Sequence, residues 1–220
     1  MHTSAKNSAA TLLLLATTTL GATAVMATVA PTPAASTTAM TNKHATLSHE
    51  QQQIQKADAL AQEGRGAMSY IVAAHRLLSE QHSGEALQYL EQARDLLVKL
   101  KPEVSTDEGN IALLPIYSQL GVKEGVEITD QLKYQLGKTH LDAVRGNHKK
   151  VIETLKAVDV ELQYSFVDLP VTATLEKVES AIKALSTKDI QQASQALVDV
   201  QKGLIQDSII VNAVNENPAG

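Results

Sequence analysis

The 220-residue sequence contains no cysteine and no tryptophan, and only one phenylalanine and five tyrosines. Without cysteine the chain can form no disulfide, thiolate nucleophile, Cys-ligated zinc site, iron–sulfur cluster or acylated lipoprotein terminus. Few aromatic rings are available to stack on bases or sugars. The apolar fraction is nevertheless 44%, so the core has to be built from Ala, Leu, Val and Ile.

Positive charge is also in short supply. Lys and Arg number 19 against 24 Asp and Glu, which gives a formal net charge of -5. This acidic balance argues against nucleic acid or an anionic membrane as an electrostatic partner. A chain of this length can bury one ordinary hydrophobic core.

The first 27 residues have the features of a secretory signal peptide. Lys6 and the amino terminus are positive, an apolar stretch begins at Leu12, and small residues follow up to Ala27. Thr17–Thr19 interrupts that stretch, which is far shorter than the roughly 20 residues that span a bilayer. We expect cleavage after Ala27, with Ala24 as the alternative site and an uncleaved amino-terminal anchor as the alternative interpretation. The product would be a periplasmic protein without a membrane anchor.

The remaining sequence predicts one α-rich domain. Residues 28–47 are rich in Thr, Ala and Pro without periodicity, which predicts a disordered tether. Residues 48–214 predict a mainly α domain of about six helices in antiparallel pairs with a small β element. Residues 215–220 are expected to be a disordered tail.

Two helices are expected to open this domain. Ser48 and Gln51 have the spacing of a capping box and predict a helix of about thirty residues. Small and apolar residues then step by three and four, at Ile54, Ala57, Ala61, Gly64, Met68, Ile71, His75 and Leu78. The small residues would let another helix approach closely, which would offset the cost of Gly64 and Gly66, about 1 kcal/mol each. A second helix with Ala86, Leu90, Ala93, Leu97 and Leu100 on one face would pack antiparallel to it.

The middle of the chain changes period. Because Pro115 has no N–H to donate to a neighbouring strand, the apolar run 111–120 is predicted to be an edge strand or an irregular core segment. A third helix is expected from Thr129 to Gly146, and a short fourth helix carries Val151, Ile152 and Leu155. Strict alternation over 158–166 predicts a strand with one solvated face.

The last third predicts two more helices and a short strand. Pro170 lies near the start of the fifth helix, where a missing N–H is tolerated. Ser186 and Thr187 are expected to cap the sixth, which buries Ile190, Ala193, Leu197, Val200 and Leu204. The β-branched segment 209–211 could pair with the strand at 158–166.

Seven histidines raise the question of a metal or catalytic site. His2 lies in the leader, His44 in the tether and His49 at its border, and the others are scattered, at His75, His82, His140 and His148. None forms an i, i+4 pair or a His-Glu-x-x-His motif. His75 falls on the apolar face of the first helix. We interpret it as a core-edge histidine satisfied by one hydrogen bond, with pH sensing as the alternative.

Other catalytic signatures are missing. No serine lies in Gly-x-Ser-x-Gly, and Gly64-Arg65-Gly66 falls within a helical pattern without the features of a phosphate loop. Acid pairs such as Glu124/Glu127 and Glu176/Glu179 fit a solvated helix face. We therefore assign no catalytic, cofactor-binding or metal-ligating residue and expect no enzyme.

Several segments resemble one bacterial family. They are Glu63-Gly64-Arg65-Gly66-Ala67-Met68, Ala74-His75-Arg76-Leu77-Leu78, Gly84-Glu85-Ala86, Phe166-Val167-Asp168-Leu169-Pro170 and Gly203-Leu204-Ile205-Gln206-Asp207-Ser208. In order and spacing they resemble the YfdX family of enterobacteria and related bacteria over about 48–214. The resemblance implies a mostly helical exported domain linked to acid and drug stress, with chaperone-like behaviour. It implies no functional residues.

Two functions therefore stand as hypotheses. The first is an exported stress protein, chaperone-like and acid-responsive, that binds unfolded or stressed polypeptides non-covalently. The second is a periplasmic carrier or sensor of a small ligand, which would require an apolar cavity with a few polar groups. Ala-rich helical seams also allow a homo-oligomer. Neither hypothesis needs a cofactor or a nucleic acid.

Overall fold

The computed structural model describes residues 11–13, 48–104, 112–123 and 125–213. The fold is mainly α with a small antiparallel sheet, as predicted. None of the described helices is long and apolar enough to cross a bilayer. In chain order the elements are β1 (Thr11–Leu13), α1 (His49–Ser79), α2 (Ser83–Leu100), β2 (Leu113–Val122), α3 (Asp130–Gly137), α4 (His140–Val144), α5 (His148–Lys156), β3 (Leu162–Pro170), α6 (Val171–Ser186), α7 (Ile190–Lys202) and β4 (Ile205–Val211).

The sheet has the strand order β1-β2-β3-β4, and every pairing is antiparallel. β1 pairs with the end of β2 at Leu120–Val122. The rest of the predicted leader, the predicted tether and the predicted tail 215–220 lie outside the described residues. β4 pairs with β3, with Tyr164 opposite Ile209, so the predicted pairing of the last strand is confirmed.

The alternating strand lies further along the chain than predicted. It begins at Leu162 and continues to Pro170, whereas 158–160 form a bend. The bend is held by the Asn212 side-chain amide, which donates to the carbonyls of Val158 and Val160. The alternation of apolar and polar residues nevertheless predicts correctly which face of β3 is buried, because Leu162, Tyr164 and Phe166 are buried.

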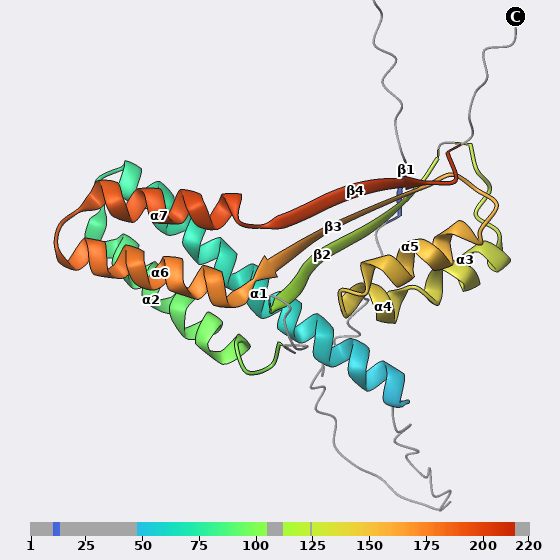
Figure 1. Ribbon diagram of the computed structural model, residues 1–220, viewed down its shortest axis with the longest axis horizontal. Coiled ribbons are helices and arrows are strands. Elements are labelled where there is room, and N and C mark those ends of the chain that lie inside the picture. The colour runs from blue at the N-terminus through green and yellow to red at the C-terminus, as the bar shows by residue number, and fades with distance from the viewer. Residues whose placement is uncertain (1–10, 14–47, 105–111, 124, 214–220) are drawn as a thin grey trace, which may run out of the picture.

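The predicted capping box at the start of α1 is present. Ser48 Oγ accepts from the Gln51 backbone N–H at 3.2 Å, and Gln51 Oε1 accepts from the Ser48 N–H at 2.9 Å. α1 and α2 form an antiparallel hairpin, as do α6 and α7. These four helices gather at one end of the sheet (Figure 1) and enclose the larger apolar core.

A strand, and not another helix, makes the close approach to Gly64. A Cβ at Gly64 would lie 2.7 Å from Ile116 Cγ2 and 2.8 Å from Leu114 Cδ2, both on β2. Next to it, Arg65 Nη1 donates to the carbonyl of Ile116 at 2.7 Å. Because Gly64 has no side chain, β2 can pack directly against α1. The Arg65 guanidinium adds a hydrogen bond between the same two elements.

Pro115 lies where the sequence predicted an edge. Over the first half of β2 the only partner strand among the described residues is β3, and the register shifts between Pro115 and Tyr117. The irregularity places the missing N–H of proline where no ladder hydrogen bond is lost.

The second apolar core lies between the other half of the sheet and α3, α4 and α5, which run along one side of it (Figure 1). The predicted third helix is split, because Thr139 is buried and its Oγ1 donates back to the Leu136 carbonyl at 2.7 Å, which ends α3 before α4 begins. Gly146 has φ +76° and ends α4, as predicted. The predicted fourth helix is α5, with Val151 and Leu155 buried.

Two details predicted for α7 were wrong. Its N-cap is Asp189, whose side chain accepts from the Gln192 N–H, and not Ser186 or Thr187. Those two hydroxyls donate to carbonyls in the last turn of α6, because that helix continues through Ser186. Of the residues predicted to be buried by this helix, Ile190 is 39% exposed at its first position, and Leu204 lies beyond its end at Lys202 and is only half-buried.

Candidate functional site

The histidine that drew attention in the sequence is not part of a cluster. His75 is half-buried on α1, and the expected hydrogen bond to its side chain is not found among the described residues. His49 and His82 contact their own helix neighbours Gln53 and Glu85. His140 is half-buried on α4, and His2 and His44 lie outside the described part of the chain.

The structure instead brings together His148, Tyr164, Phe166 and Asp168. His148 Nδ1 lies 2.8 Å from Tyr164 Oη, and His148 Nε2 lies 2.8 Å from Asp168 Oδ2. The imidazole stacks on the Phe166 ring, with centroids 3.6 Å apart and planes 12° apart. One histidine of α5 thus contacts three consecutive inward-facing side chains of β3, which we call the His148 cluster.

The cluster is buried, and its hydrogen bonding is incomplete. The His148 side chain is 14% exposed and that of Asp168 only 3%. Asp168 Oδ1 has no hydrogen-bond partner among the described residues. A buried carboxylate oxygen without a donor costs free energy, about 1 to 3 kcal/mol or more for a charged group, so Asp168 lies in an environment that is poor for a fixed charge.

The donors and acceptors define one neutral arrangement of the histidine. The Tyr164 hydroxyl donates to Nδ1, and Nε2–H donates to Asp168 Oδ2. Burial, and secondarily the charge of Asp168, raises the pKa of Tyr164 well above its ordinary value of 10.0. The phenol therefore keeps its proton and can donate it to the imidazole.

Local structure places each member of the cluster. Alternation along β3 sends the tyrosine, phenylalanine and aspartate to one face. On the other side, the left-handed Gly146 turns the chain from α4 into α5, and a Cβ there would lie 3.0 Å from Pro115 Cγ. Asn147 and Lys150 both donate to Asp142 of α4, at 3.2 Å and 3.1 Å. The start of α5 is therefore fixed both to β2 and to α4.

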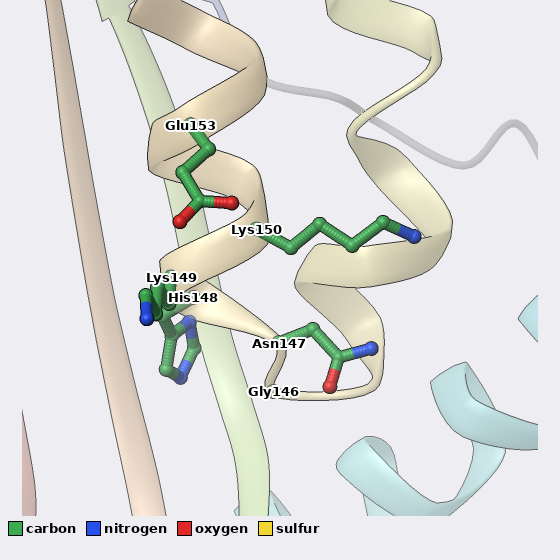
Figure 2. Close-up of a pocket in the computed structure, with 6 residues that line it drawn as sticks. All are labelled: Gly146, Asn147, His148, Lys149, Lys150 and Glu153. Atoms are coloured by element: carbon green, nitrogen blue, oxygen red, sulfur yellow. The ribbon is translucent and has the colours of Figure 1, made fainter.

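A depression of about 600 Å³ adjoins the cluster at the start of α5. Figure 2 shows Asn147 and Lys150 reaching toward the neighbouring helix, whereas His148 points toward the strands. Gly146, Lys149 and Glu153 complete the lining. His148 thus lines the depression and also contacts the second core, through its stack on Phe166.

The chemistry that the cluster can carry follows from its donor set and its burial. Within the described residues no group of three or more His, Asp and Glu side chains could hold a metal ion. The Tyr164 phenol is only 2% exposed, so it does not face a substrate. What remains is an imidazole and a carboxylate that together hold the start of α5 on β3.

Sequence reasoning missed this site, although one signal was available. Extending the alternation of Tyr164 and Phe166 by two residues places Asp168 on the same buried face. A buried acid needs a partner. That the partner is His148 depends on how α5 folds back over the sheet, which no local pattern reveals.

Comparison with known proteins identifies the family. The family model described as YfdX protein matches residues 67–209. Among solved structures, that of Salmonella Typhi YfdX is similar, with a TM-score of 0.46 and 24% identity, covering 68% of this chain and 90% of that chain. No curated protein matches the chain. Because the matched family residues make up more than half of the sequence, the chain belongs to the YfdX family, as its segments had indicated.

Proposed function

We propose that this chain is an exported, stress-associated protein that binds unfolded or stressed polypeptides non-covalently, in a chaperone-like and acid-responsive manner. The observation that carries the proposal is the His148–Asp168 pair within the second core. Export to the periplasm is supported by the leader-like features of residues 1–27. The proposed activity is binding and needs neither catalysis nor a cofactor.

Acid changes the pair in two steps. The first proton makes His148 a cation beside a carboxylate 2.8 Å away, which strengthens their attraction. It also turns Nδ1 into a donor facing the donor hydroxyl of Tyr164, so that the phenol must find another acceptor. The second proton, on Asp168, removes the counter-charge and leaves a buried cation unpaired, which is strongly unfavourable. Contact between α5 and β3 is therefore weakest when both groups are protonated.

Loosening of α5 would uncover apolar surface suited to a non-native polypeptide. The second core is separate from the larger one, and the helices that cover one side of it are all short. A small core of this kind can open while the four-helix end of the molecule stays folded, because local opening costs less free energy than global unfolding.

The experiment measures binding of an apolar dye and light scattering by an aggregating client between about pH 7 and about pH 4. We expect dye binding to rise and scattering to fall toward the acid end. Asp168→Asn removes the ion pair, so the transition should move toward neutral pH. Glu176→Gln, which neutralises an exposed acid on α6 at the four-helix end of the molecule, is the matched control. Flat dye binding with undiminished scattering would contradict the proposal.

A small-ligand carrier or sensor is the alternative, and the depression at the start of α5 is the observation that favours it. It is lined by polar and charged residues and one glycine, whereas ligand pockets are lined mostly by apolar and aromatic side chains, so we rank it second. A thermal-shift screen against periplasmic metabolites and drugs tests it, and a ligand that stabilises the wild type but not Lys149→Ala would support it.

Self-association, which the Ala-rich seams allow, is measured by light scattering after size exclusion.

A further inference from the structure

We infer that the free edge of β4 pairs with β4 of a second copy of this chain, so that two sheets join into one continuous antiparallel sheet. β4 is the last strand in the order β1-β2-β3-β4, and among the described residues its only partner strand is β3. Five of its seven residues are exposed, and Figure 1 shows it along the upper margin of the three long strands. The inference is independent of the polypeptide binding proposed above.

The two edges of the sheet are protected differently. An open edge offers N–H and C=O groups to another chain, and proteins block such edges with proline, lysine or a β-bulge. On the β2 side, Pro115 and the register shift next to it interrupt the edge, and Arg65 donates to the Ile116 carbonyl. β4 has no proline and no lysine, and its residues pair one for one with β3 from Ile205 to Val211. The β4 edge is therefore a regular surface for one more strand.

The side chains of β4 suit a strand of its own kind. Ile209, Ile210 and Val211 are β-branched and favour strand structure, and Ile210 is 59% exposed. On the face turned away from the second core, β4 carries Gln206, Ser208 and Ile210, none of which is charged. The chain as a whole has a formal net charge of -5, so two copies repel each other least where such an uncharged surface meets its own copy.

Symmetry and charge together define the register. In an antiparallel pair of identical strands related by a two-fold axis, the central residue lies opposite its own copy. With Ser208 at the centre, all seven residues of β4 are paired, from Ile205 to Val211. With Asp207 at the centre, two carboxylates would lie directly opposite each other, which is destabilising. With Ile209 at the centre, the ladder would shorten to 207–211. We therefore place Ser208 on the axis.

The hydroxyl of Ser208 has a hydrogen-bonding position left for its copy. Gln163 Nε2 donates to Ser208 Oγ at 2.8 Å, and Ser165 Oγ lies 2.8 Å from the same atom, with either hydroxyl able to donate. A hydroxyl has one donor and two acceptor positions, and these two contacts use two of the three. The polar row that runs from β3 to β4 can therefore continue across the axis.

Because the chain has no cysteine, single-cysteine cross-linking can measure the register. Directly opposite Cα atoms of an antiparallel pair lie about 4.5 to 5.5 Å apart, a distance that a disulfide bridges. Ser208→Cys should therefore give a disulfide-linked dimer on oxidation. Gln206→Cys and Ile210→Cys are exposed controls on the same face, but each would lie about 13 Å along the strand from its own copy. We expect them to cross-link about tenfold more slowly or less.

Two charge variants test the dimer without a covalent bond. Ser208→Lys and Ser208→Asp each place like charges opposite each other on the axis, so each alone should lower the association constant by about tenfold or more in sedimentation velocity. An equimolar mixture of the two should dimerise again, because lysine then lies opposite aspartate.

The matched control for these variants is Gln163→Lys. It adds a charge to the same face one strand further from the edge and removes the same hydrogen bond to Ser208, so it should remain dimeric. Circular dichroism verifies that all three charge variants are folded.

The outcomes decide between the possible occupants of the edge. Preferential linkage of Ser208→Cys, with loss of the dimer in both charge variants and its recovery in the mixture, would support the inference. A wild type that is monomeric at every concentration, or equal linkage of all three cysteine variants, would overturn it. A dimer unaffected by Ser208→Lys would place the contact on the Ala-rich helical seams and would also overturn it. Linkage of Ser208→Cys to a cysteine-bearing client polypeptide in place of a second copy would contradict the partner named here.

Discussion

The imidazole of His148 on α5 lies flat against the ring of Phe166 on β3, with 3.6 Å between their centroids. The stack joins a titratable ring directly to the apolar floor of the second core. Any movement of α5 that relieves a buried charge on the imidazole therefore also uncovers an aromatic side chain. This contact between a titratable ring and apolar surface is the physical basis of the acid response that we propose.

Gly64 should not tolerate a side chain. In Gly64→Ala the new Cβ would meet Ile116 Cγ2 and Leu114 Cδ2 at less than 3 Å, and we expect overpacking to cost about 1 to 3 kcal/mol. Gly84→Ala is the control, since nothing lies within 4 Å, and it should be neutral or stabilise by up to about 1 kcal/mol. Urea unfolding measures both. A stabilised Gly64→Ala variant would show that β2 does not press on α1.

Gly146 is needed for two separable reasons. Gly146→Ala places a side chain in the left-handed region at φ +76°, at a cost of about 1 to 2 kcal/mol, and also crowds Pro115. Gly125→Ala has φ +86° and nothing nearby, so it should show the backbone cost alone. Thermal unfolding of both, with Pro115→Ala added to Gly146→Ala, measures the contact. No recovery in the double variant would argue that Pro115 does not matter.

Tyr164 should make the fold sensitive to alkali. Its raised pKa means that the folded state keeps the phenolic proton above pH 10, whereas the unfolded state loses it. The unfolded state therefore binds fewer protons, and stability falls by about 1.4 kcal/mol per pH unit above that value. Tyr164→Phe should lose stability less steeply between about pH 10 and about pH 11.5. Parallel slopes in urea unfolding would contradict this assignment.

The Asn212 side chain is expected to stabilise the end of α5. Its amide donates to carbonyls of Leu155, Val158 and Val160, and its backbone is left-handed at φ 59°. Asn212→Gly keeps the backbone freedom and removes the amide, so its cost of about 1 to 3 kcal/mol reports the hydrogen bonds. Hydrogen exchange in α5 should rise in the same variant. Unchanged exchange there would mean that the bend is held by other contacts.

The leader makes a direct prediction. Expression of the full sequence in a bacterium should give a periplasmic protein whose first residue is Thr28, or Val25 if cleavage follows Ala24. Intact mass of the periplasmic fraction measures it. A protein that retains Met1 and sediments with membranes would instead support the uncleaved anchor.

The sequence by itself determined the elements whose cause is local. The capping box at Ser48 and the buried face of α2 needed no tertiary information, because hydrogen bonding and helical periodicity act within a few residues. The position of Pro115 at an edge and of Gly146 at a helix end followed from the conformations that these residues permit.

Tertiary structure decided the rest. The split between α3 and α4, the cap at Asp189 and the strand pressing on Gly64 all depend on neighbours distant in sequence or on competing local bonds. The candidate site is the clearest case. His148 and Asp168 are 20 residues apart, and only the packing of α5 on β3 turns an isolated histidine and an acid on an apolar face into one buried pair.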